Sequence, residues 1–166
     1  MKKYVLIGAS LVCITGISLY FVLGGNAELI FLVEDQQEQV IYGELFQGRP
    51  SEPRLEALFI KARDRSKETG RNLMIVTYDQ DSVPLKQFIG TLQGPRDTKG
   101  LDTLILPAGK YITIEIKSHN LVMPRPDEIR EAAEDFALKQ NLKIQTKLSY
   151  EGYEGDSAMV VWFRCE

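Results

Sequence analysis

The sequence passes twice through the same order of predicted elements, and this repeat restricts the fold more than any other feature. Each pass runs strand, strand, helix, strand, strand. The predicted elements of the first pass are residues 29–33, 40–46, 54–69, 73–78 and 87–92. Those of the second pass, about 72 residues later, are 101–106, 111–117, 126–140, 144–150 and 158–164. One such unit is too small to bury a sheet by itself, so we expect the two units to fold together.

Both predicted helices carry a single apolar stripe at the spacing i, i+3, i+4, i+7, which is typical of a helix that packs on a sheet. The stripes consist of Leu55, Leu58, Phe59 and Ala62 in the first helix and Ile129, Ala132, Ala133 and Phe136 in the second. We expect Ser51 to be the N-cap of the first helix and Gly70 to end it. The pattern predicts an α+β domain of two duplicated β-β-α-β-β units, related by a pseudo-two-fold axis. Its sheet is expected to be mainly antiparallel, with both helices on one face.

Two of the predicted strands, 73–78 and 158–164, are apolar on both of their alternating faces. A sheet covered by helices on one side and water on the other would instead alternate apolar and polar residues. Something therefore covers the second face of these strands. A ligand groove between the halves, a dimer partner, loops and simple core packing all satisfy this requirement.

An uncharged apolar segment at 4–23 follows Lys2 and Lys3 and precedes the repeat. Its length of about 20 residues matches a bilayer-spanning helix. The positive-inside rule places the lysines in the cytoplasm. We therefore predict a single-pass membrane anchor or signal segment at 1–27 and an extracytoplasmic domain at 28–166. The alternative is cleavage near Ala27, which would give a secreted or periplasmic protein.

Charge and composition exclude several functional classes. Without Lys2 and Lys3, the 20 basic residues fall to 18 against 23 acidic residues, a net charge of −5. A domain this acidic, without a Lys/Arg run, is not expected to bind nucleic acid. The single histidine, His119, and two distant cysteines provide neither a metal site nor an intramolecular disulfide. No phosphate loop or catalytic triad is present, so no cofactor is expected.

Three stretches of the repeat resemble the GyrI-like effector-binding domain. They are the strand at 74–79, which ends in Tyr-Asp, the Leu-Pro-Ala-Gly-Lys-Tyr stretch at 106–111, and the Glu-x-Tyr element within 150–153. The resemblance covers about residues 40–164. Members that regulate transcription carry a DNA-binding helix-turn-helix before this domain, whereas an apolar segment stands there in this sequence. In that respect the chain resembles the membrane-anchored members, which include a testis-expressed ER-phagy receptor.

The resemblance implies a ligand cleft between the two halves, lined by aromatic residues around one central acid. It assigns the glutamate and tyrosine of the Glu-x-Tyr element to Glu151 and Tyr153. The other aromatic candidates are Tyr78, Tyr150 and Trp162. Aromatic rings and a desolvated carboxylate suit an organic cation. The alternative is that Glu151 lies in an exposed turn at 151–156.

The strands themselves supply two further acidic candidates. Glu115 shares a predicted strand face with Tyr111 and Thr113, and Glu44 has a similar place beside Tyr42. Solvent-exposed strand faces have the same pattern, so these two acids are weaker candidates than Glu151.

These observations favour a membrane-tethered domain that binds a hydrophobic or cationic small molecule, as a sensor or scavenger. A second hypothesis is a small hydrolase that acts on reactive electrophiles, with Glu151 as the general base. A third is a protein-interaction module at the membrane. The sequence names no protein partner.

Overall fold

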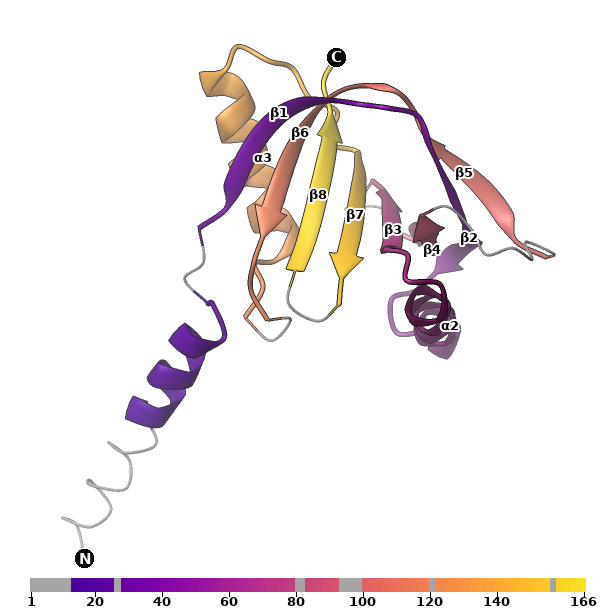
Figure 1. The fold of residues 1–166 in the computed structure, drawn as a ribbon, viewed down its shortest axis with the longest axis horizontal. Helices are drawn as coiled ribbons and strands as arrows, with labels where there is room; N and C mark the ends of the chain where they lie inside the picture. The colour runs from indigo at the N-terminus through magenta and orange to yellow at the C-terminus, as the bar shows by residue number, and fades with distance from the viewer. Residues whose placement is uncertain (1–12, 26–27, 80–82, 93–99, 120–121, 156–157) are drawn as a thin grey trace, which may run out of the picture.

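The computed structural model describes residues 13–25, 28–79, 83–92, 100–119, 122–155 and 158–166. Eight strands and two helices form its folded part (Figure 1). The elements are β1 (Ile30–Gln36), β2 (Gln39–Gly48), α2 (Pro53–Thr69), β3 (Leu73–Tyr78), β4 (Leu85–Leu92), β5 (Asp102–Leu106), β6 (Gly109–Ile116), α3 (Pro126–Lys139), β7 (Leu148–Glu154) and β8 (Ala158–Arg164).

The strands form one eight-stranded sheet in the order β1-β6-β8-β7-β3-β4-β2-β5, and every neighbouring pair is antiparallel. The predicted α+β class and antiparallel sheet are therefore confirmed. The sheet curls strongly, with α3 behind it in Figure 1 and α2 beside β3 and β4. The strand order places β7 of the second pass next to β3 of the first, at the middle of the sheet.

Side chains on opposite faces of this sheet belong to different core clusters. On one face, Ile114 and Val161 pack with Ala133 of α3, and Phe46 and Ile89 pack with Leu58 of α2. Both helices thus cover the same face, which we call the helix face. The second face holds a helix-free cluster of Ile41, Met74, Val76, Phe88, Leu106, Tyr111 and Tyr150. The curl of the sheet brings β2 and β6 together over this face, which explains why β3 is apolar on both sides.

The helix ends agree only in part with the predicted ones. Gly70 ends α2 in the left-handed conformation (φ 64°), as predicted. The N-cap is Glu52 and not Ser51: Pro53 occupies the first turn, and the carboxylate of Glu52 accepts a hydrogen bond from the backbone N–H of Arg49 at 2.7 Å. Because proline is favoured at the start of a helix, it fixes the boundary one residue after the serine that looked like a cap.

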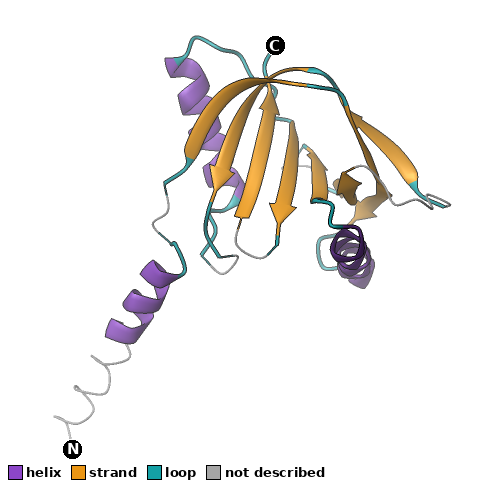
Figure 2. Ribbon diagram, viewed as in Figure 1, coloured by secondary structure: helices purple, strands orange, loops and turns teal. Residues whose placement is uncertain are grey.

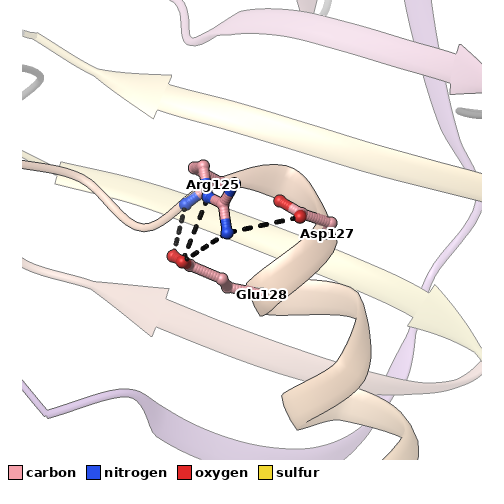
Figure 3. Close-up of polar contacts among 3 residues, drawn as sticks. All are labelled: Arg125, Asp127 and Glu128. Atoms are coloured by element: carbon pink, nitrogen blue, oxygen red, sulfur yellow. Dashed lines mark hydrogen bonds and ion pairs between the residues drawn. The ribbon is translucent and has the colours of Figure 1, made fainter.

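Arg125 and Glu128 define the start of α3. The backbone N–H of Arg125 donates to Glu128 Oε2 at 3.0 Å, and the Arg125 guanidinium donates to Glu128 Oε1 (Figure 3). Arg125 also approaches Asp127, with 3.6 Å between Nη2 and Oδ2. The backbone hydrogen bond, followed by that from the side chain, holds the pKa of Glu128 below its usual value. This cap fixes the position of the loop that leads into α3.

The strand predicted at 144–150 is wrong, because β7 runs from Leu148 to Glu154. Ile144 forms only an isolated bridge to Cys165. The glycine-containing stretch from Glu151 onward resembles a turn, which is why the prediction ended the strand too early. Gly152 instead makes room for its neighbour: a Cβ atom there would lie 2.7 Å from the ring of Trp162 on β8. The glycine therefore belongs inside the strand, under an aromatic ring.

The described part of the N-terminal segment is a helix at 13–22, which projects away from the sheet (Figure 2). It exposes its apolar side chains, and the Leu23 carbonyl accepts a hydrogen bond from the backbone N–H of His119 at 2.9 Å. Within the residues that the structure describes, no helix has the length and apolar character needed to cross a bilayer. Residues 4–12 of the predicted anchor and the cleavage position at Ala27 lie outside the described residues.

Candidate functional site

Glu151 lies in the middle of β7, at the centre of the sheet. The strand register pairs it with Ile75 on β3 and Val161 on β8. Val161 packs against α3, and directly paired residues point to the same face of a sheet. The carboxylate of Glu151 therefore points to the helix face, and the alternative of an exposed turn is excluded.

A cavity of about 300 Å³ opens beside this carboxylate, between β7, β8 and the start of α3. It is lined by Met123, Pro124, Arg125, Pro126, Ile129, Glu151, Tyr153, Met159, Val161 and Phe163. Most of these side chains are apolar, and Glu151 is the one carboxylate among them. Arg125 is the one cation of the lining, and Asp127 and Glu128 already neutralise it. We call this space the Glu151 cavity.

Two hydroxyl groups contact the Glu151 carboxylate. The Tyr153 hydroxyl donates a hydrogen bond to Oε2 at 2.8 Å, and the side chain of Ser149 forms a second hydrogen bond. Burial raises the pKa of Glu151 above its usual value, and these two hydrogen bonds offset only part of the rise. Burial also raises the pKa of Tyr153, and the neighbouring carboxylate adds to the effect. The site thus contains a desolvated acid whose charge lacks full compensation.

This raised pKa makes the stability of the protein depend on pH. At pH values above the usual glutamate pKa of about 4.3, Glu151 loses its proton in the unfolded state. In the folded state it keeps the proton up to a higher pH, because its pKa is raised. The free energy of unfolding of the parent should therefore decrease as pH rises from about 4.3 through the raised pKa, by about 1.4 kcal/mol per unit of pKa difference. We expect Glu151→Gln to remove this decrease and to be more stable than the parent at pH 7. Urea denaturation between pH 4 and 8 measures both, and parallel curves for the two proteins would contradict the assignment.

The structure divides the six predicted site residues between the two faces of the sheet. Glu151 and Tyr153 lie together on the helix face. Tyr150 is adjacent to Glu151 in the strand and so points to the other face, where it packs in the helix-free cluster with Tyr78 and Trp162. Burial, followed by the nearby hydroxyls of Tyr111 and Tyr78, raises the pKa of Tyr150 to about 12.

The two weaker acidic candidates are also separate from the Glu151 cavity. Glu115 pairs with Val160 in the register of β6 and β8, and its Oε2 lies 3.8 Å from Lys117 Nζ. Glu44 forms an ion pair with Lys61 of α2. Among the residues that the structure describes, no group of three or more potential ligands is arranged to hold a metal ion.

Two larger cavities lie farther along the helix face. One, of about 530 Å³, lies beside the start of α2 and shares Phe59 with the other, of about 460 Å³, beside the end of α2. The second of these shares Tyr153 with the Glu151 cavity.

The sequence prediction missed the lining residues from the loop before α3, Met123 and Pro124, and from α3 itself, Ile129. The Pro-Arg-Pro stretch at 124–126 stands at the start of the helix predicted at 126–140, and nothing in its residue types points to a binding site.

Comparison with solved structures defines the class of fold. No protein-family model matches the sequence, and no curated protein does. The C-terminal domain of EcmrR is similar over 83% of this chain and 98% of its own, with a TM-score of 0.60 and 10% identity. SAV2435 bound to tetraphenylphosphonium is similar over 82% of this chain and 94% of its own, with a TM-score of 0.56 and 9% identity. These neighbours share the fold of this chain.

A third similar structure is a hydrolase from Listeria innocua. It matches over 82% of this chain and 91% of its own, with a TM-score of 0.55 and 10% identity. At these identities the likeness establishes the fold, and the site must be interpreted from its own residues.

Proposed function

We propose that this protein binds a hydrophobic organic cation in the Glu151 cavity. The observation that carries the proposal is a single desolvated carboxylate in a mostly apolar cavity. Burial of such a charge without a counter-charge costs free energy, and a bound cation would recover it. Tyr153 and Phe163 line the cavity, and aromatic rings attract the same kind of ligand. The tetraphenylphosphonium complex of SAV2435 supports this ligand class.

Calorimetric titration of the full chain, purified in an uncharged detergent, with tetraphenylphosphonium tests this function. We expect saturable binding to the parent, and at least tenfold weaker binding to Glu151→Gln, because the amide keeps the shape but removes the charge. Glu115→Gln removes the same charge on the opposite face and serves as the matched control, with unchanged affinity. Triphenylphosphine oxide, a neutral compound of similar shape, should bind the parent and Glu151→Gln equally. Equal binding of the cation to the parent and Glu151→Gln would contradict the proposal.

The contact between Tyr153 and Glu151 also favours a second candidate, hydrolysis of a reactive electrophile. A carboxylate with a raised pKa is suited to accept a proton from water. The Tyr153 hydroxyl, which donates to Glu151 Oε2 at 2.8 Å, would turn away from the protonated carboxyl and donate to the developing oxyanion. Spectrophotometric assay of activated aryl esters and small epoxides tests this role. Turnover that disappears in Glu151→Gln and persists in Glu115→Gln would support it, and turnover that survives in Glu151→Gln would remove it.

We further propose that residues 4–23 anchor the protein in a membrane, with the domain outside the cytoplasm. The charge asymmetry around the segment supports this, as do the exposed apolar side chains of its described part, such as Ile14, Ile17 and Val22. A chain with a C-terminal tag should stay full length in carbonate-washed membranes, and protease added outside the cytoplasmic membrane should digest it. A shorter soluble product that starts near Glu28 would instead indicate cleavage near Ala27. A full-length domain that is protected from the protease would mean that the domain faces the cytoplasm, opposite to the proposed orientation.

We also infer that the two halves of the fold are a duplicated unit. The strand order inward from β1 is β6, β8, β7, and the order inward from β5 is β2, β4, β3, so equivalent elements of the two passes hold equivalent places. This arrangement supports a pseudo-two-fold axis between β3 and β7, beside Glu151. Superposition of 39–92 on 109–164 with the strands in register would support the inference, and a fit of the helices alone would contradict it.

A further inference from the structure

The cavity beside the end of α2 differs in charge from the Glu151 cavity. It has a volume of about 460 Å³ and is lined by Phe59, Arg63, Ser66, Lys67, Gly70, Arg71, Asn72, Leu73, Tyr153, Glu154 and Gly155. Three of these residues are basic and one, Glu154, is acidic, which leaves the described lining with a net charge of +2. Since the whole chain has a net charge of −3, this is a local concentration of positive charge. We call it the basic cavity.

The positive charges of the basic cavity are poorly neutralised by the rest of the described chain. The described residues place no carboxylate within 4.0 Å of the charged groups of Lys67 and Arg71, and Arg63 has only Asp64, at 3.9 Å. Glu154, the acidic residue of the lining, accepts a hydrogen bond at Oε1 from Asn72 Nδ2 at 3.3 Å and forms no ion pair with Arg63, Lys67 or Arg71. The three cations are therefore available to an anion from outside.

The rest of the lining favours an organic anion over an inorganic one. Phe59, Leu73 and Tyr153 form an apolar wall between α2 and β7, and Phe59 and Tyr153 are only partly buried. An inorganic phosphate would leave this wall in contact with water. An aromatic or aliphatic body attached to the anionic group would cover it.

We propose that the basic cavity is a second binding site, separate from the Glu151 cavity, for an amphipathic organic anion. Arg63, Lys67 and Arg71 bind its carboxylate, sulfonate or phosphate group, and the apolar part lies on Phe59, Leu73 and Tyr153. Guanidinium groups suit such anions because they donate paired hydrogen bonds. The site does not depend on cation binding at Glu151, since the two cavities share only Tyr153.

Site-resolved NMR titration of the full chain in an uncharged detergent tests this proposal. The probes are naphthalene-2-sulfonate and its neutral analogue naphthalene-2-sulfonamide. We expect the sulfonate to shift the backbone amide signals of Gly70, Arg71 and Gly155 in a saturable manner, with at least tenfold higher affinity than the sulfonamide. Arg63→Gln/Arg71→Gln should lower the sulfonate affinity at least tenfold. The matched control is Arg49→Gln/Arg54→Gln, which removes the same charge from exposed positions outside the cavity and should bind like the parent.

Several results would overturn the proposal. They are equal affinity for the two probes, undiminished sulfonate binding by the Arg63/Arg71 variant, and sulfonate shifts confined to the Glu151 cavity. Basic residues near a helix C-terminus also stabilise the helix dipole. A variant that loses thermal stability but binds the sulfonate like the parent would therefore assign these residues to helix stability alone. If the double variant fails to fold, Lys67→Gln provides the same test with a smaller expected loss, about threefold. Glu151→Gln should bind the sulfonate with the same affinity as the parent. The sulfonate titration therefore tests the basic cavity even if the proposed cation binding at Glu151 is wrong.

Discussion

Gly90→Ala should abolish most of the stability of the domain, with a loss of more than about 3 kcal/mol. Gly90 on β4 is the register partner of Gly43 on β2. A Cβ atom at Gly90 would lie 2.7 Å from the carbonyl carbon of Tyr42 and 2.8 Å from the Cα of Gly43. Both are backbone atoms, so a rotamer change cannot relieve the overlap, and the two strands would have to separate. Urea denaturation followed by circular dichroism measures the loss.

Gly155→Ala is the matched comparison for this substitution. Among the described residues, no heavy atom beyond its immediate chain neighbours lies within 4 Å of the position that its Cβ would take, but its backbone is left-handed, with φ at 67°. We expect it to cost about 1–2 kcal/mol, from backbone strain alone. If Gly90→Ala were no less stable than Gly155→Ala, the close approach of β2 and β4 would be wrong.

Tyr111→Ala should destabilise the domain by about 3–5 kcal/mol. Tyr111 on β6 is fully buried in the helix-free cluster, where the curl of the sheet brings β6 over β2 and β3. Its ring packs edge-to-face on Tyr150, with 6.2 Å between centroids, and its hydroxyl donates to the Pro107 carbonyl at 2.8 Å. Removal of the ring leaves a cavity that the neighbouring strands cannot fill.

Tyr111→Phe separates the ring from its hydroxyl. It keeps the packing and loses one hydrogen bond, so we expect a loss of only about 1 kcal/mol in the same denaturation experiment. Equal losses for the alanine and phenylalanine variants would mean that the hydroxyl, and not closure of the sheet over Tyr111, stabilises this face.

Local patterns predicted the elements of this fold well where side chains alone determine them. The strands at 73–78 and 158–164 are confirmed to the residue, and both helical stripes face the sheet. The prediction failed at β7, where Gly152 is required by the ring of Trp162, a contact between residues that the sequence does not reveal as neighbours.

The bounds of β7 also determine which of the predicted residues lie together at the site. Because Leu148–Glu154 is one strand, its side chains alternate between the two faces of the sheet. Glu151 and Tyr153 therefore point to one face, and Tyr150 points to the other. The predicted strand ended at Tyr150, so this period was not applied to Glu151, and the aromatic residues were grouped from the resemblance to the GyrI-like domain. The cavity wall from the loop before α3 depends on how α3 packs on β8, which no local pattern encodes.

Titration of the Glu151 carboxylate itself is the direct test of whether this group binds the cation. The pKa of Glu151 can be followed by carboxyl ¹³C NMR in the full chain, with and without saturating tetraphenylphosphonium. We expect a pKa above the usual glutamate value in the free protein, because burial raises it. A bound cation should lower that pKa, and by linkage the affinity for the cation should rise with pH through the same range. A Glu151 pKa that is unchanged by saturating cation would contradict cation binding at this carboxylate.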